Sequence, residues 1–229
     1  DGSVVTIGQT ITQSDISAGA LTFTPLANDN GAGYDSFAYT VNDGVADSLA
    51  SATMTIDVTA VNDLPTSSDN TVTATEDTAF VFATANFGFA DVETDQLQGI
   101  TVTTLASTGT LALNGSTVTL GQSISRSNIE AGNLKFTPAT NANGTGYDSF
   151  KFTVNDGTAD SSASSTMTID VTAVNDSPVG VADSYTTLQN TQLTGTVGSN
   201  DLLQNDSDAD PDVLAVNTTP VSNVANGTL

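Results

Sequence analysis

The chain has 229 residues, of which 26 are acidic and three are basic, so its formal net charge is -23. This charge repels a phosphate backbone, which excludes nucleic acid as a partner. The chain has no cysteine and no histidine, so it offers neither thiolate nor imidazole ligands, and hard oxygen-ligand chemistry remains. Self-repulsion is relieved by a salty medium or by bound divalent cations, and both indicate a location outside the cell.

Membrane insertion of this segment is not expected. A helix needs roughly 20 apolar residues in succession to cross a bilayer, and no run in the sequence approaches that length.

The sequence repeats itself with a period of 113 residues. Residues 1–65 align to residues 114–178 without a gap, and 45 of the 65 aligned positions are identical. The string TMTIDVTAVND occurs unchanged at 53–63 and at 166–176. We therefore predict three segments: the C-terminal part of a repeat at 1–65, a complete repeat at 66–178, and the N-terminal part of a further repeat at 179–229.

The two partial segments together make almost one whole repeat. One interpretation is that the ends of the chain are arbitrary boundaries within a longer array. The other is that the halves of neighbouring molecules complete each other. A strictly monomeric fragment on sizing would exclude the second interpretation.

In chain order, the complete repeat first shows a predicted hairpin over residues 111–120. Its two alternating runs meet at Asn114-Gly115, a pair that favours the positive φ angles of a tight turn. Farther along, apolar residues alternate with polar ones over 150–154 and again over 167–173. Asn155 begins the loop between these two strands, and each strand is expected to have one buried and one wet face.

The fold class predicted from these patterns is all-β. Helical periodicity never extends beyond two turns, and about seven short strands in a repeat of this length are typical of an immunoglobulin-like β-sandwich. A solenoid is the alternative, but it would show periods nearer 20 to 50 residues. Tandem sandwiches in an extended array are thus expected.

Acidic residues gather where one repeat passes into the next. The pairs Asn62-Asp63 and Asn175-Asp176 follow the last strand of each repeat, and Glu76 lies shortly after the first pair. A turn is the plain interpretation of an Asn-Asp pair. However, two carboxylates about 5 Å apart repel by roughly 3 kcal/mol, and almost no Lys or Arg offsets this. Calcium, which accepts six to eight oxygen ligands, is the predicted cofactor, and catalytic residues are not expected.

Two other motifs have competing interpretations. Residues 206–210 resemble the start of an EF-hand loop, but Pro211 stands where glycine is required and Asn217 where glutamate is required, which excludes that motif. Tyr34 and Tyr147, each in the string GYDSF, are either sugar-stacking rings or buried rings at a sandwich corner.

The string LKFTPATNANGTGYDSFKFTVNDG at 134–157, followed by VNDSP at 174–178, resembles the cadherin-like repeats found in tandem in very large secreted bacterial adhesins of the RTX, type I secretion class. The resemblance implies an extracellular sandwich with calcium at each junction between repeats. It implies these ligands at the first junction: Asp43, Asn62, Asp63, Glu76, Asp91 and Glu93. At the second junction it implies Asp156, Asn175, Asp176, Asp206 and Asp208.

This sequence departs from the cadherin pattern at two places. The first aspartate of the linker motif is replaced by Ala60 and Ala173, and the counterpart of the upstream glutamate at the second junction is Gln189. Fewer ions per junction than in animal cadherins, and weaker binding at the second junction, are therefore expected.

The predicted function is that of a calcium-stiffened extender in a large surface adhesin, which supports attachment of cells to surfaces or to one another. Its expected partners are neighbouring repeats, with like repeats on another molecule or surface glycans as further possibilities. The alternative is a carbohydrate-binding or homophilic adhesion module. An enzyme is not expected, because the acids recur with the repeat and no aromatic-lined cleft is indicated around them.

Overall fold

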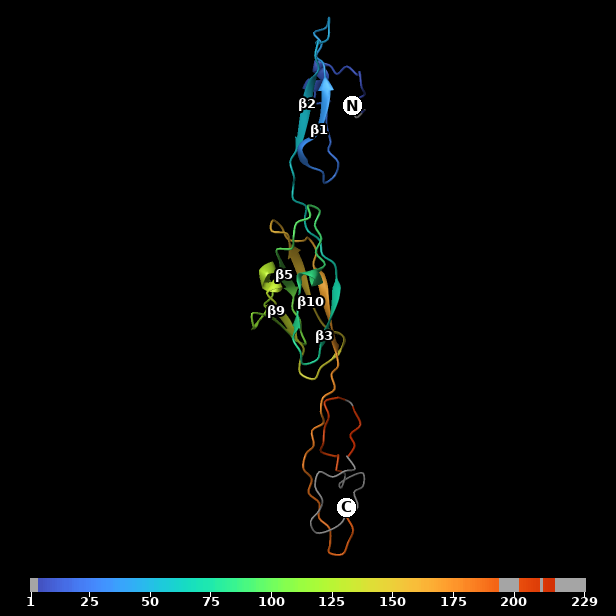
Figure 1. Cartoon of the computed structure of the whole chain (residues 1–229), viewed down its shortest axis with the longest axis vertical. Helices are drawn as coiled ribbons and strands as arrows, with labels where there is room; N and C mark the ends of the chain where they lie inside the picture. The colour runs from blue at the N-terminus through green and yellow to red at the C-terminus, as the bar shows by residue number, and fades with distance from the viewer. Residues whose placement is uncertain (1–3, 194–201, 211, 217–229) are drawn as a thin grey trace. The chain divides into compact units, whose positions relative to one another are not determined.

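The computed structural model describes residues 4–193, 202–210 and 212–216 (Figure 1). The end of the predicted third segment, residues 217–229, lies outside this range. The chain divides into two compact units, Asp1–Asp63 (unit 1) and Leu64–Leu229 (unit 2), and each is described by itself.

From residue 4 onward, unit 1 contains one short helix and a two-stranded sheet. The helix α1 covers Gln13–Ser17, and the strands β1 and β2 cover Gly31–Tyr39 and Ala52–Val58. The strands pair antiparallel, from Tyr39 opposite Ala52 to Gly31 opposite Val58, with a bulge between Gly31 and Asp35.

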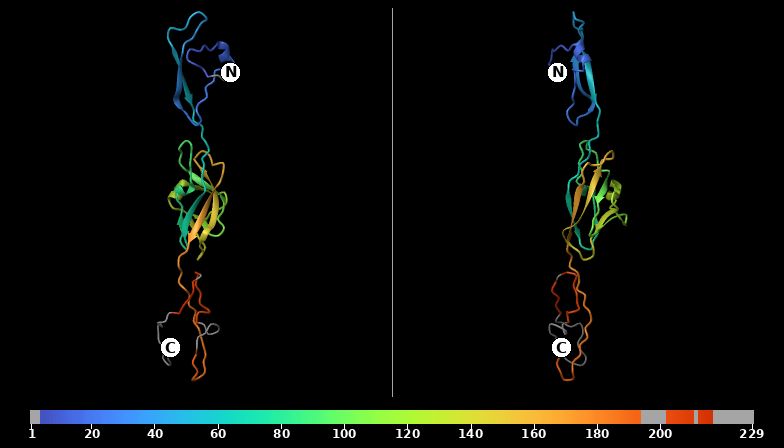
Figure 2. Two further views of the ribbon diagram at one scale, coloured as in Figure 1. Left: turned by 90° about the vertical axis from the view of Figure 1, so that its right-hand side faces the viewer. Right: turned by 180° about the vertical axis from the view of Figure 1, so that it is seen from behind.

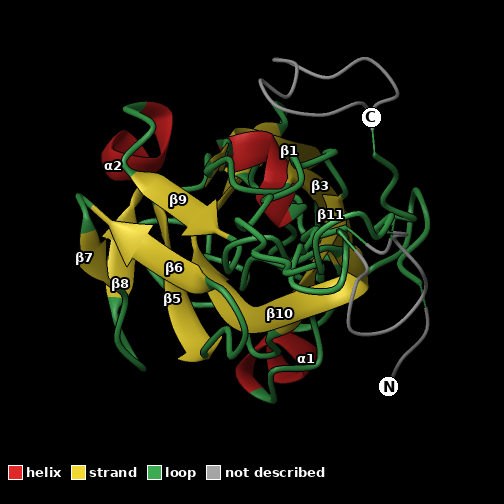
Figure 3. Ribbon diagram, turned by 90° about the horizontal axis from the view of Figure 1, so that it is seen from below, coloured by secondary structure: helices red, strands yellow, loops and turns green. Residues whose placement is uncertain are grey.

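The described residues of unit 2 form two sheets, one with the order β3-β11-β10-β5-β8 and one with the order β4-β9-β6-β7. Figure 3 shows how strongly strands dominate over the short helices. The elements are β3 Asn70–Thr75, β4 Phe80–Val81, η1 Thr84–Phe87, β5 Gly99–Thr104, β6 Thr110–Leu113, β7 Ser116–Thr117, β8 Ser123–Ser125, α2 Arg126–Glu130, β9 Leu134–Thr137, β10 Gly144–Asn155 and β11 Ser165–Thr172. The prediction of an all-β fold is confirmed.

The core of unit 2 lies between its two sheets and follows from the alternation of apolar side chains. Phe150, Phe152 and Val154 on β10 are fully buried, as are Met167 and Ile169 on β11, whereas the residues between them are more exposed. Alternate residues of a strand point to opposite faces, so each of these strands gives one face to the core. Aromatic rings meet edge to face across the core, with Phe152 5.0 Å from Phe87 and Phe150 5.6 Å from Phe82 between ring centroids.

The predicted hairpin is confirmed. Leu113 on β6 pairs with Ser116 on β7, and the two residues between them, Asn114 and Gly115, have φ angles of 51° and 79°. Such angles favour Asn and Gly over residues with a branched side chain.

The first strand of unit 2 pairs parallel to the last one. β3 lies beside β11 in an unbroken register from Asn70 opposite Met167 to Thr75 opposite Thr172. Both strands therefore end on the same side of the sandwich. This side, with the residues that follow Thr75 and Thr172, is called the exit end below, and the opposite side, next to Thr66, is called the entry end.

No helix within the described part of the chain is both long enough and apolar enough to span a bilayer.

Candidate functional site

At the exit end, Glu76 is a buried carboxylate. Its side chain is 3% exposed, and it follows directly after β3. One carboxylate oxygen accepts the Val174 N–H at 2.9 Å, and both oxygens lie 3.3 Å from the side-chain nitrogen of Asn143. The hydrogen-bond donors that contact the buried Glu76 carboxylate are neutral, so a cation beside it would stabilise its charge.

Asp176 lies in the same region and is surrounded by other acids. Its backbone N–H donates to a carboxylate oxygen of Asp210 at 2.6 Å. Burial of the carboxylate, followed by the charges of Asp210, Asp77, Glu76 and Asp208, raises the pKa of Asp176. The ionised form is thus disfavoured, which is the expected condition of a carboxylate gathered with others in the absence of a cation.

At the entry end, Asp91 occupies a comparable position. Thr66 and Ala90 exchange two backbone hydrogen bonds, so Asp91 lies beside the point where the chain enters the repeat. One carboxylate oxygen, Oδ1, accepts the N–H groups of Glu93 at 2.9 Å and of Asp95 at 3.1 Å. This local turn holds the carboxylate in place.

Two buried side-chain oxygens in the described residues lack a hydrogen-bond partner, Oδ2 of Asp91 and Oδ2 of Asp176. Buried polar atoms are nearly always paired in folded proteins, so each of these oxygens is able to accept a further partner. One lies at the entry end and the other at the exit end. Nevertheless, no group of three or more acidic side chains in the described ranges is arranged closely enough to hold a metal ion as it stands.

The residues predicted around the second junction are only partly brought together. Asp208 accepts the Asp210 N–H at 2.9 Å, and Asp206 accepts the Val181 N–H at 2.6 Å, while Val179 and Ser207 bridge their two segments. Asn175 donates through its side chain to the Asp176 carbonyl at 2.6 Å. These bonds fold the segment after Asp176 back towards it.

Asp156 lies away from this group. It follows β10, whose C-terminal end pairs with the start of β11, since Phe152 is opposite Ser165. Asp156 and Asp176 therefore stand at opposite ends of β11. The Asp156 carboxylate accepts the N–H groups of Thr158 at 2.6 Å and Ala159 at 2.7 Å, which orders the loop.

Glu76 also lies elsewhere than predicted, because the prediction from the sequence placed it with Asp91 and Glu93 at the first junction. The parallel pairing of β3 with β11 brings it instead to Val174, at the exit end. Since a glutamate stands there, Gln189 gives no reason to expect weaker binding at that end.

The remaining predicted residues of the first junction belong to unit 1. Asp43 follows β1, and its carboxylate accepts the N–H groups of Ala46 at 2.9 Å and Val45 at 2.8 Å, which lower its pKa. Asn62 and Asp63 follow β2, and the Asn62 side chain donates to the Asp63 carbonyl at 2.7 Å. Because β1 and β2 are antiparallel, Asp43 lies at the opposite end of this sheet from Asn62 and Asp63.

Two acids of the exit end, Asp77 and Asp210, were left out of the ligands predicted from the sequence. Asp77 accepts the Asn141 N–H at 3.1 Å, and Asp210 accepts the Asp176 N–H. The signal was present, because Asp77 adjoins Glu76, and Asp210 continues the alternation of Asp206 and Asp208.

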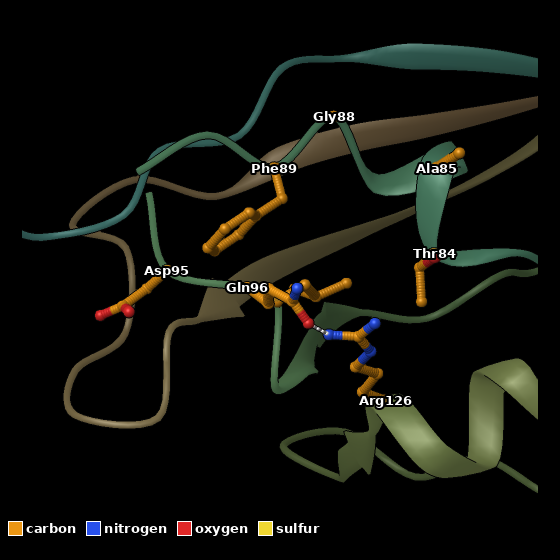
Figure 4. A pocket seen from close by; sticks show the side chains of 8 residues that line it. Thr84, Ala85, Gly88, Phe89, Asp95, Gln96 and Arg126 are labelled. Atoms are coloured by element: carbon orange, nitrogen blue, oxygen red, sulfur yellow. Dashed lines mark hydrogen bonds between the residues drawn. The ribbon is translucent and has the colours of Figure 1, made fainter. Parts of the chain in front are cut away.

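A shallow hollow elsewhere on unit 2 holds Arg126, one of the three basic residues of the chain (Figure 4). Phe89 and Leu97 form part of its lining. The guanidinium is already engaged, because Nε donates to Glu130 at 2.6 Å and Nη1 donates to the side-chain oxygen of Gln96. This hollow therefore offers no free positive charge to an anionic ligand.

Comparison with known proteins gives a family match over the middle of the chain. Residues 62–172 match the family model described as a bacterial Ig domain. The match supports a bacterial Ig-type repeat, and these residues are called the Ig-type repeat below. The two carboxylate groups of the Ig-type repeat thus lie at the two ends of its sandwich, where the chain enters and leaves it.

No curated protein matches the chain. Among solved structures, an endo-fucoidan hydrolase of glycoside hydrolase family 107 matches with 23% identity and a TM-score of 0.26, over 65% of this chain and 20% of that one. The chain thus spans one fifth of that enzyme's length, and a similarity at this TM-score carries no argument about the Ig-type repeat.

Proposed function

We propose that the chain is a calcium-stiffened spacer from a large bacterial surface adhesin, which holds a binding region away from the cell. The observation that carries this proposal is the pair of buried, unpartnered oxygens, on Asp91 and Asp176, at the two ends of the Ig-type repeat. Bacterial Ig-type repeats are typical of surface proteins, which supports a location outside the cell.

The exit end gathers carboxylate oxygens, the type of ligand that a hard cation prefers. Glu76 and Asp176 leave the sandwich side by side, and Asp208 and Asp210 come from the segment that follows it. Calcium binds carboxylate and carbonyl oxygens in flexible geometry, so it would neutralise the repulsion that raises the pKa of Asp176. Asp91 and Glu93 would bind calcium at the entry end. No residue is assigned to catalysis.

Binding of this kind stiffens a chain because it ties successive segments to one ion. Without calcium, mutual repulsion of the acids opposes the approach of the segments, and the net charge of -23 adds to that repulsion. With calcium, the Asp208 and Asp210 segment is fixed against the end of the Ig-type repeat.

The alternative, recognition of a sugar or of a like repeat, receives less support. The Tyr147 ring packs edge to face on Phe136, and its hydroxyl accepts the Ala139 N–H at 3.0 Å. The ring and the hydroxyl of Tyr147 therefore make structural contacts at a corner of the sandwich.

Calorimetric titration of the whole chain with calcium tests the proposal, together with small-angle scattering in calcium and in chelator. We expect saturable heat and a larger maximum dimension in calcium. Asp176→Asn should weaken binding by roughly tenfold or more, because a charged ligand is lost, whereas Asp183→Asn, an exposed acid in the following segment, should leave it unchanged. The absence of binding, or equal affinity in both variants, would reject the proposed site.

A further inference from the structure

Unit 1 exposes apolar side chains whose exact counterparts in unit 2 form the core. Phe37, Tyr39 and Met54 are 45%, 40% and 47% exposed. At an offset of 113, their counterparts Phe150, Phe152 and Met167 are 0% exposed. Large apolar residues gathered on one sheet in this way are a sign of a contact surface.

The backbone of unit 1 already has the conformation of the complete repeat. The pairing of β1 with β2 repeats that of β10 with β11 residue by residue, including the bulge. The hydrogen bond from Gly33 to Asp57 is 2.6 Å long, as is the equivalent one from Gly146 to Asp170. The β1–β2 sheet therefore needs no rearrangement to pair with further strands as the β10–β11 sheet does.

In unit 2 the equivalent face is covered by residues 66–113. They supply β3, which pairs parallel with β11, and β5, which pairs antiparallel with β10. They also supply the rings of Phe82 and Phe87, which contact Phe150 and Phe152. In the described part of unit 1, by contrast, β1 and β2 form a sheet of two strands alone (Figure 2).

The Asp35 carboxylate of unit 1 also has a counterpart that binds this covering segment in unit 2. In unit 2, the buried carboxylate of Asp148 accepts the N–H groups of Ser107, Thr108 and Gly109 at 2.9 to 3.1 Å. Its counterpart Asp35 is exposed and accepts the N–H of Ser36 at 2.7 Å. Asp35 is thus an acceptor suited to a turn with three successive free N–H groups.

We propose that the β1–β2 face of unit 1 is an acceptor for the leading half of an Ig-type repeat, a segment with the pattern of residues 66–113. This occupant adds a strand parallel to β2 and a strand antiparallel to β1. It also brings aromatic rings onto Phe37 and Tyr39 and a turn of N–H groups onto Asp35. The assignment rests on the internal copy of the same face in unit 2 and is independent of calcium.

The test adds a fluorescently labelled polypeptide spanning residues 64–113 to the whole chain and follows its anisotropy. We expect saturable binding with one polypeptide per chain. Phe37→Asp should weaken binding by more than about 100-fold, since the matching ring in unit 2 is fully buried. Ser36→Asp is the matched control, because it adds the same charge to β1 at the position of exposed Ser149, and it should bind as the wild type does.

Equal binding by Phe37→Asp and the wild type, or no binding, would overturn the proposal. Association of the chain with itself that Phe37→Asp abolishes, without the added polypeptide, would assign the face to a second copy and would also overturn it.

A second measurement avoids the free polypeptide altogether. Residues 64–113 are fused before Asp1, so that Leu113 is followed by Asp1-Gly2, the equivalent of the Asn114-Gly115 turn. Hydrogen exchange of β1 and β2 should then slow to the rates of β10 and β11. Unchanged exchange of β1 and β2 in the fused chain would contradict the proposal.

Discussion

Asp148 is the buried acid whose replacement is most informative about the fold. Its side chain is 6% exposed, and it receives backbone N–H groups from Ser107, Thr108, Gly109 and Ser149. Burial alone raises the pKa of such a group, but these four N–H bonds outweigh it and lower the pKa of Asp148 overall. The carboxylate thus holds the loop before β6 against β10.

Asp148→Asn keeps the shape of the side chain but leaves one oxygen to accept these bonds. Hydrogen bonds to a charged group contribute about 1.5–3 kcal/mol each, so the loss of two bonds should lower the free energy of unfolding by about 3 kcal/mol. With a urea m-value of about 2 kcal/mol/M, this is a shift of the midpoint by about 1.5 M.

Asp35→Asn is the matched control, because Asp35 occupies the equivalent position in unit 1 but is exposed. It should change the free energy of unfolding of unit 2 by less than about 0.5 kcal/mol. Urea unfolding followed by circular dichroism measures both variants, and hydrogen exchange of β5 and β10 locates the loss. An unchanged midpoint in Asp148→Asn, or an equal shift in Asp35→Asn, would refute this reasoning.

The pH dependence provides an independent check. A carboxylate whose folded pKa is lowered stabilises the fold above its unfolded pKa of about 4, and this contribution is lost as the pH falls through the folded value. Wild-type unit 2 should therefore lose more stability below about pH 4 than Asp148→Asn does.

Three further changes are expected to have separable effects. Phe152→Ala empties a fully buried position and should cost about 3–5 kcal/mol in thermal unfolding, whereas Tyr39→Ala at the equivalent exposed position should leave that transition unchanged. Gly109→Ala places a methyl group in steric overlap with the Phe136 ring and should lower the free energy of unfolding in urea by about 1–3 kcal/mol. In chelator, Asp176→Asn should stabilise the chain at pH 7, and urea titrations should show this gain vanishing below about pH 4, because the pKa of Asp176 is raised and protonation then removes the same repulsion.

Local patterns were enough to predict the strands and one turn. The alternation around Phe150 and Phe152, and the Asn114-Gly115 pair, act through neighbouring residues, and the structure has them as expected. The predicted alternation of buried and exposed residues after β10 ends one position early. Met167, Ile169 and Val171 are buried, but Ala173 is exposed because β11 ends at Thr172.

Pairing between distant strands could not be predicted in the same way. Nothing in the residues around Glu76 says that β3 lies parallel to β11, yet this pairing alone brings Glu76 to Val174. Asp210 joins Asp176 for a similar reason, because the chain turns back over more than thirty residues. Burial of Asp148 also depends on a distant loop, at Ser107. Ligand sets inferred from order along the chain therefore need the strand pairing before they can be assigned to one end of a repeat.

The parallel pairing of β3 with β11 has a mechanical consequence. These are the first and last strands of the Ig-type repeat, and they share an unbroken register over six residue pairs. When the repeat is pulled by its two ends, β3 is drawn from its N-terminus and β11 from its C-terminus, so the strands are forced to slide past each other. All hydrogen bonds between them then bear the tension together, whereas in an antiparallel pair opened from one end they would break one after another. A repeat built in this way resists a pulling force with the same bonds that close its sandwich.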